Sequence, residues 1–153
     1  MIEPIRRSIV VRCSPERAFE VFTAEMSSWW PFETHSIAAD TERGRARRVV
    51  VEPRVGGRVY EVQADDTEAS WGEVRVWDPP RSLVLGWKPN DRPQPLTELE
   101  VTFTVHGEGT TVTLEHRGWE LLGSSATASR EGYLAGWPVV FDERYGDAAN
   151  AAA

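Results

Sequence analysis

The chain has 153 residues, a net charge of -7 and a single cysteine. At this length one domain buries about 68–70% of the surface of its unfolded chain, which is enough for a core without disulfide staples. The acidic charge gives no broad attraction for phosphate backbones or anionic lipids, and no apolar run is long enough to span a bilayer, so nucleic-acid binding and membrane insertion are disfavoured.

The first predicted elements are a strand at residues 5–12 and a helix that begins after it. Ser14 supplies an N-cap, Pro15 occupies the first helical position and Glu16 adds an early acid, which together mark a helix start. Cys13 lies at this junction and has no partner for an intrachain disulfide. Because the opening residues also lack the apolar region and cleavage site of a secretory signal, we expect a cytoplasmic protein.

A second short helical turn is predicted at residues 27–31, where the sequence SSWWP ends in a proline. Residues 33–45 are polar and have no clear period, so we expect a long loop over one end of the domain, where functional residues are common. The basic cluster at the end of this loop is interpreted as a solvated loop and edge strand. It consists of Arg43, Arg45, Arg47 and Arg48.

Strand-like runs separated by turns fill residues 49–119. Every second residue from 99 to 105 is apolar and polar residues lie between them, which is typical of a half-buried antiparallel strand. In the next run, steps of two lead from Val112 and Leu114 to His116. The pattern therefore predicts that the His116 side chain points inward.

The same parity argument places other large side chains. Residues 78–81, DPPR, predict a tight turn between two strands. Trp87 is expected on the inner face, and Trp71 and Trp77 on the outer face provided that no β-bulge intervenes. Glu61 either turns its carboxylate inward or lies at an edge-strand bend or in a solvent-facing salt bridge.

A helix is predicted after Trp119, with an aromatic stripe at helical spacing. Pro138 removes a backbone donor and is expected to kink or divide this helix. Residues 146–153 are interpreted as a fraying tail, so the domain is expected to cover residues 1–146, with a flexible tail at 147–153. The stripe consists of Tyr133, Trp137 and either Val140 or Phe141.

Several motifs along the chain resemble those of a known family. They are WWP at 29–31, EPRVGGR at 52–58, WGEV at 71–74, DPP at 78–80 and LEHRGW at 114–119. They resemble bacterial proteins of the START/Bet v 1-like (SRPBCC) superfamily, in the branch related to the C-terminal domain of the activator of Hsp90 ATPase. The resemblance covers nearly the whole chain. It implies an α+β helix-grip fold, in which a curved antiparallel sheet wraps around a long C-terminal helix and two short helices follow the first strand.

The resemblance also implies a hydrophobic pocket between the sheet and the last helix. Pockets of this superfamily bind lipids, sterols, polyketides or other apolar molecules. The large aromatic side chains of this chain either fill the core or line such a pocket, with a few polar groups to orient a ligand. The candidate ligand-binding residues are Trp30, Phe32, His35, Trp87, His116, Tyr133, Trp137 and Phe141.

Three functions stay open. The first is the binding of a small apolar molecule without a cofactor. The second is a protein-interaction module, as the likeness to an Hsp90 activator implies, with a chaperone or a second copy of the chain as partner and Trp71 and Trp77 as exposed contacts. The third is an enzyme resembling polyketide cyclases or dehydratases, with His116 or Tyr133 as acid or base. His116 is also interpretable as a hydrogen-bonded core histidine.

Patterns for other chemistries are missing from the sequence. The three histidines and the single cysteine have no metal-ligand spacing, so no metal site is expected. There is no GxSxG nucleophile elbow, no GxxxxGK[ST] phosphate loop and no GxGxxG after a strand. No cofactor is therefore expected.

Overall fold

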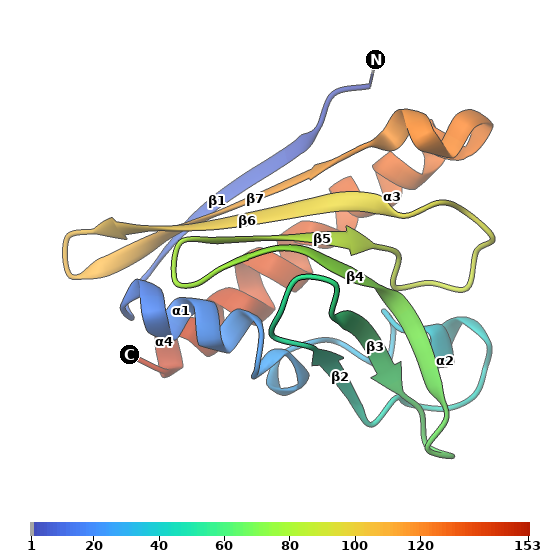
Figure 1. The fold of residues 1–153 in the computed structure, drawn as a ribbon, viewed down its shortest axis with the longest axis horizontal. Coiled ribbons are helices and arrows are strands. Elements are labelled where there is room, and N and C mark those ends of the chain that lie inside the picture. The colour runs from blue at the N-terminus through green and yellow to red at the C-terminus, as the bar shows by residue number, and fades with distance from the viewer. Residues whose placement is uncertain (1) are drawn as a thin grey trace.

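A curved antiparallel sheet forms the frame of the computed structural model, which describes residues 2–153 (Figure 1). Its seven strands are β1 (Ile5–Val11), β2 (Arg48–Val51), β3 (Arg58–Val62), β4 (Glu68–Asp78), β5 (Ser82–Trp87), β6 (Thr97–His106) and β7 (Gly109–Arg117). Each strand from β2 to β6 pairs with the next one along the chain, and β1 pairs with β7. Six of the strands therefore form a meander, which needs only short connections except for the loop between β5 and β6.

The helices gather on the inner side of this sheet (Figure 1). After β1 come α1 (Pro15–Phe22), the 3-10 turn η1 (Met26–Ser28) and α2 (Ile37–Asp40). After β7 come η2 (Trp119–Ser125), α3 (Ala126–Trp137), the π-helical η3 (Pro138–Tyr145) and α4 (Gly146–Ala151). The last three run on as one rod that the sheet grips, so the predicted α+β helix-grip fold is confirmed.

The start of α1 follows the predicted capping pattern. The Ser14 hydroxyl accepts a hydrogen bond from the backbone N–H of Arg17 at 3.2 Å, and Pro15 opens the helix. The apolar side of the helix faces the core through Ala18, Phe19, Val21 and Phe22, which are all buried. The segment predicted to be a long loop after η1 contains α2, a single turn capped by the Ser36 hydroxyl.

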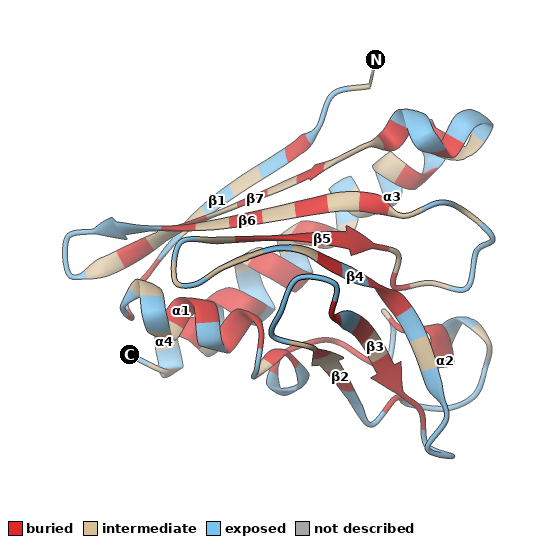
Figure 2. Cartoon of the chain, viewed as in Figure 1, coloured by how far each residue is buried: buried red, intermediate tan, exposed pale blue. Residues whose placement is uncertain are grey.

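The inner face of the sheet has the alternation that the sequence predicts. Along β6, buried positions alternate with half-buried ones from Thr97 to Phe103, visible as alternating red and tan in Figure 2. His116 of β7 lies opposite Leu99 of β6, and both side chains are fully buried. The predicted inward direction of His116 is therefore confirmed.

The prediction that Trp71 and Trp77 lie on the outer face is wrong. The pairing of β4 with β3 skips Trp71, and its pairing with β5 skips Arg75, so β4 carries two bulges that reset the parity. Trp71 is completely buried. Trp77 packs its ring edge-on against Phe19 with the ring centroids 5.0 Å apart. Neither tryptophan is an exposed contact residue.

Pro138 changes the type of helix instead of ending it. It lacks the N–H that would bond to the preceding turn, and the wider π-helical η3 begins at this residue. The helical path then continues through α4, where Ala149 is fully buried and the Asn150 side chain accepts a hydrogen bond from the Arg12 N–H at 2.8 Å. The fraying predicted from Gly146 onward is replaced by a packed helix, because its small residues fit against α1 and β1.

Among residues 2–153, no helix combines the length and the apolar character that crossing a bilayer requires.

Gly72 marks the closest approach between β4 and β5. A Cβ at this position would lie 1.8 Å from the carbonyl oxygen of Gly86. We expect Gly72→Ala to lower the free energy of unfolding by about 2–3 kcal/mol, because the backbone must shift to admit the methyl group. Urea unfolding measures the change, with Ser70→Ala on the exposed side of the same strand as the control. An unchanged urea midpoint for Gly72→Ala would contradict this close approach.

Candidate functional site

A pocket with a volume of about 190 Å³ is lined by residues of the segment 30–40, of α3 and of the loop between β5 and β6. Its floor is the face of α3 that carries Ser129, Gly132 and Gly136. One side is formed by residues of the segment 30–40, and the mouth is bordered by Asn90 and Arg92 of the β5–β6 loop. The pocket is open to solvent on this side, since Asp40 and Arg92 are both exposed.

Half of the predicted ligand-binding residues line this pocket. They are Trp30, His35, Tyr133 and Trp137. The other half lie in the core and do not reach the pocket surface. They are Phe32, Trp87, His116 and Phe141, each at most 2% exposed.

An aromatic cluster supports the pocket from behind. The rings of Trp30, Trp71 and Trp87 contact one another with centroid distances between 5.0 and 5.7 Å. Trp87 also stacks on Trp137 at 6.2 Å, and Trp137 stacks on Tyr133 at 6.0 Å. Because these rings interlock in edge-on and stacked pairs, the wall presents fixed aromatic faces.

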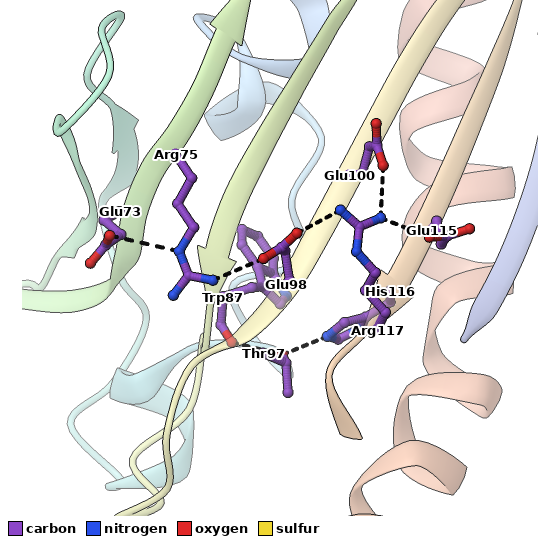
Figure 3. Close-up of polar contacts among 9 residues, drawn as sticks. All are labelled: Glu73, Arg75, Trp87, Thr97, Glu98, Glu100, Glu115, His116 and Arg117. Carbon is purple, nitrogen blue, oxygen red and sulfur yellow. Dashed lines mark hydrogen bonds and ion pairs between the residues drawn. The ribbon is translucent and has the colours of Figure 1, made fainter. Parts of the chain in front are cut away.

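His116 holds Trp137 in place through a buried hydrogen-bond chain. The Trp137 Nε1–H donates to His116 Nδ1 at 3.1 Å. On the other side of the ring, His116 Nε2 lies 2.7 Å from the Thr97 hydroxyl (Figure 3). That hydroxyl donates its only hydrogen to the Trp87 carbonyl oxygen at 3.0 Å, so His116 Nε2 must carry a proton. The imidazole is therefore neutral, and both ring nitrogens are occupied.

This arrangement assigns His116 to the core instead of to acid–base chemistry. Burial lowers the pKa of the imidazole to about 3. The side chain is completely buried and does not line the pocket. Of the two interpretations of this histidine, the hydrogen-bonded core residue is the one that the geometry supports.

The polar groups inside the pocket are neutral, and the charged ones lie at its mouth. Burial lowers the pKa of the half-buried His35, whose Nδ1 lies 2.7 Å from the Thr34 hydroxyl. Burial also raises the pKa of the Tyr133 hydroxyl above its ordinary value. At neutral pH the inner pocket thus offers an imidazole and a phenol without charge, while Asp40 and Arg92 lie in solvent.

Glu61 connects the rim of the pocket to the sheet. Its buried carboxylate accepts hydrogen bonds from the backbone N–H groups of Ile37 and Ala38 at 2.6 and 2.9 Å, and from the Trp71 indole at 2.8 Å. The Gln63 amide donates a further bond at 3.3 Å. Of the readings for Glu61, the inward carboxylate is the correct one, and it sets the position of α2 beside the pocket.

Sequence reasoning missed several pocket residues. The predicted functional loop contains Ser36 and Asp40, so its location gave a usable signal for these two. Asn90 and Arg92 lie in a polar loop between strands with nothing to distinguish them. Ser129 and the two glycines of α3 carry no motif, and only the packing of the helix reveals them.

A second hollow, with a volume of about 330 Å³, lies on the outer face of the sheet. Three of its charged side chains satisfy one another, since Glu98 pairs with Arg75 at 3.2 Å and with Arg117 at 2.5 Å (Figure 3). Arg117 also bonds to Glu100 and Glu115 at 2.7 Å. This hollow is larger, but the aromatic faces and free polar groups lie in the first pocket, which we therefore take as the candidate site.

Among residues 2–153, no group of three or more histidine, cysteine, aspartate or glutamate side chains is arranged to hold a metal ion.

Comparisons with known proteins give one family and several structural neighbours. The family model for activator of Hsp90 ATPase homolog 1-like proteins matches residues 12–143. The anthrahydroquino-γ-pyrone synthase Txn09, solved in complex with SUM, is 32% identical over 96% of this chain and 97% of its own, with a TM-score of 0.63. The self-sacrificing resistance protein CalC from Micromonospora echinospora is 28% identical over 97% and 94% of the two chains, with a TM-score of 0.74.

A more distant neighbour shares the fold alone. It is the Aha1 dimer from Colwellia psychrerythraea, which is 15% identical over 99% of this chain and 98% of its own, with a TM-score of 0.69. A search of curated proteins finds no match to this chain.

Replacing the Glu61 carboxylate tests its role at the rim. Glu61→Gln keeps the shape of the side chain but replaces one carboxylate oxygen by an amide NH₂ group. This group cannot accept the hydrogen bonds that the oxygen accepts. We expect the free energy of unfolding to fall by about 1–3 kcal/mol, because buried donors lose their acceptor. Chemical denaturation measures this, with Glu73→Gln, an exposed side chain of β4, as the matched control. Equal stability of the two variants would show that the rim does not depend on Glu61.

His116 makes the stability depend on pH. Its pKa is about 3 in the folded state and about 6.5 in the unfolded state, so below pH 6.5 the unfolded chain binds a proton that the folded chain excludes. Full stability is present above pH 6.5, and we expect a loss of about 1.4 kcal/mol per pH unit as the pH falls further towards the folded pKa. Urea unfolding at pH 7.0 and 5.0 measures this slope.

A variant series separates His116 from His35, whose lowered pKa acts in the same direction. His116→Gln is expected to be less stable at pH 7.0 but to have a flatter pH dependence than the parent. His35→Gln is expected to remove only a smaller part of the slope, because His35 is half-buried. If His116→Gln keeps the full slope, the buried imidazole is not its source.

Proposed function

Because this chain belongs to the family of activator of Hsp90 ATPase homolog 1-like proteins, we propose that its pocket binds a small, flat aromatic molecule of polyketide-like character. The observation that carries this proposal is the wall formed by Trp30, Tyr133 and Trp137 beside the helix floor. Stacked or edge-on contacts with such rings favour a planar ligand by about 0.5–1.5 kcal/mol each, in addition to the surface that they bury.

The volume of the pocket narrows the ligand class. At about 190 Å³ it is smaller than the roughly 300–1,000 Å³ typical of sites for drug-sized ligands, and larger than a cavity of about 150 Å³ that holds benzene. One or two fused rings can therefore be buried, and a larger ring system would extend through the mouth towards Asn90 and Arg92. A sterol or a lipid chain fits this shape less well than a fused aromatic system does.

The neighbours add support from outside this chain. Txn09 is named as the synthase of an anthrahydroquino-γ-pyrone, which is a fused aromatic compound by its name, and its structure is a complex with SUM. It is 32% identical to this chain over almost the whole length. We take an aromatic polyketide-like compound as the class of ligand that this likeness favours.

A cyclase-like reaction is the second candidate function. What favours it is the neutral imidazole of His35 on the wall of the pocket, next to a region that a ligand would occupy. His116 does not serve here, because both its nitrogens are bonded within the core. This candidate is supported if the parent protein converts a polyketide-like substrate and His35→Gln binds the substrate without converting it. Equal conversion by the parent and by His35→Gln would contradict it.

A protein-interaction role has less support. The tryptophans expected to form an exposed contact surface are packed inward, so a chaperone or a second copy of the chain as partner rests on family membership and on the fold of the Aha1 dimer.

A cytoplasmic location belongs to the proposal as well, and rests on the single buried cysteine, Cys13.

Ligand binding is tested by filling the pocket. Gly132 lines it, and a Cβ at this position would meet nothing within 4 Å. We expect Gly132→Leu to block aromatic ligands without destabilising the fold, because leucine is the better helix former by about 0.8–1 kcal/mol. The readout is the thermal midpoint with 2-naphthol, 1-hydroxyanthraquinone, a fatty acid and a sterol.

For the parent protein, an aromatic compound at one hundred times its dissociation constant should raise the midpoint by about 5–11 °C. Gly132→Leu should show no such rise. The matched control is Ala135→Leu, which adds the same side chain to an exposed position of α3 outside the pocket. A flat response of the parent to all four compounds, or equal responses of the two leucine variants, would refute the proposed function.

A further inference from the structure

Ser129 has a buried hydroxyl group without a partner. The residue is 4% exposed and lines the pocket, and its Oγ is one of two buried side-chain polar atoms among residues 2–153 that have no hydrogen bond. A buried polar group is nearly always hydrogen-bonded, because leaving it without a partner costs free energy. The hydroxyl oxygen has almost no accessible surface of its own. A ligand can therefore supply the missing bond once the Ser129 side chain turns towards the pocket that the residue lines.

The neighbouring serine shows what Ser129 lacks. One turn earlier, the Ser125 hydroxyl donates to the Leu122 carbonyl oxygen and accepts from the Gln94 amide, both at 3.0 Å. Ser125 thus ties the β5–β6 loop to the start of α3. Serine hydroxyls within helices commonly bond back to the preceding turn, and Ser129 makes no such bond.

The other unpartnered atom marks no site. It is Trp87 Nε1, which does not line the pocket. Its ring packs against the rings of Trp30, Trp71 and Trp137 in the aromatic cluster.

Two glycines continue the surface that begins at Ser129. Gly132 and Gly136 follow it at helical spacing, so all three residues lie on one face of α3. A Cβ at Gly132 would meet nothing within 4 Å, and at Gly136 the nearest atom would be His35 Nε2 at 3.6 Å. Glycine lowers the stability of a helix interior. Here it leaves the backbone of the helix bare and keeps the floor of the pocket flat.

The flanking residues complete a slot of defined shape. Tyr133 and Trp137 each follow one of the glycines, and their rings are inclined by only 25° to one another. The flat helix face and these nearly parallel rings suit a planar molecule. The unpartnered hydroxyl of Ser129 lies at one end of this surface, so it would orient a polar substituent of the ligand towards that end.

We propose that Ser129, Gly132 and Gly136 form a subsite for the oxygenated edge of a fused aromatic ligand. The ring system lies over the two glycines, and a phenol hydroxyl or a carbonyl group on its edge hydrogen-bonds to Ser129. A serine hydroxyl donates to a carbonyl and accepts from a phenol, so both groups fit. This inference rests on the proposed function and adds to it the substituent that the pocket selects.

The test compares two probes of the same shape. 2-Naphthol carries a hydroxyl group where 2-methylnaphthalene carries a methyl group, so only the first can bond to Ser129. Equilibrium dialysis gives the dissociation constant of each probe for the parent protein, for Ser129→Ala and for Thr127→Ala. Thr127→Ala is the matched control, because it removes an exposed hydroxyl from the same helix.

The expected result is selective. Ser129→Ala weakens 2-naphthol about five- to tenfold, as the loss of one hydrogen bond predicts, and changes 2-methylnaphthalene by less than about twofold. Thr127→Ala changes neither probe. The thermal midpoint of Ser129→Ala without ligand is equal to that of the parent or higher, because the removed hydroxyl has no partner in the protein.

Other outcomes overturn the subsite and are distinguishable from failure of the proposed function. If Ser129→Ala weakens both probes equally or neither of them, the pocket still binds aromatic molecules but Ser129 does not select the oxygen. A lower midpoint of the unliganded variant would show a hydrogen bond within the protein itself. If the parent binds neither probe, the proposed function falls and the subsite falls with it.

Discussion

The buried imidazole of His116 joins the C-terminal helix to the sheet. Through it, the indole of Trp137 on α3 is connected to Thr97 on β6 and to the backbone of Trp87 on β5. Because each donor in this chain has one acceptor, the bonds set the tautomer of the imidazole and the direction of the Trp137 ring together. The pocket wall depends on this chain, since Trp137 is one of the rings that face a ligand.

A second polar anchor lies on the opposite side of the pocket. Glu61 binds the first two N–H groups of α2 and the indole of Trp71, so the rim and the aromatic cluster share one carboxylate. Both anchors use their polar atoms to hold the shape of the pocket. The Ser129 hydroxyl, in contrast, has no hydrogen-bond partner within the protein, and this is why we propose it as a contact for a ligand.

The two faces of the sheet carry different kinds of side chain. On the outer face, Arg117 and Glu98 belong to a network of ion pairs that satisfies its own charges. On the inner face, aromatic rings and neutral polar groups form a surface that water solvates poorly. A small apolar molecule gains most by leaving water for the inner face, which is why the smaller of the two hollows is the candidate site.

Local rules in the sequence determined the strands, the cap of α1 and the inward direction of His116, because alternation and capping act over a few residues. They did not determine the side on which Trp71 lies, since the bulges of β4 arise only when its neighbours pair with it. The pocket itself was decided by the tertiary structure. Asn90 is far along the chain from Ser129 and Gly132, and none of the three carries a motif. They become one site only because the sheet curves around α3 and brings the β5–β6 loop against that helix.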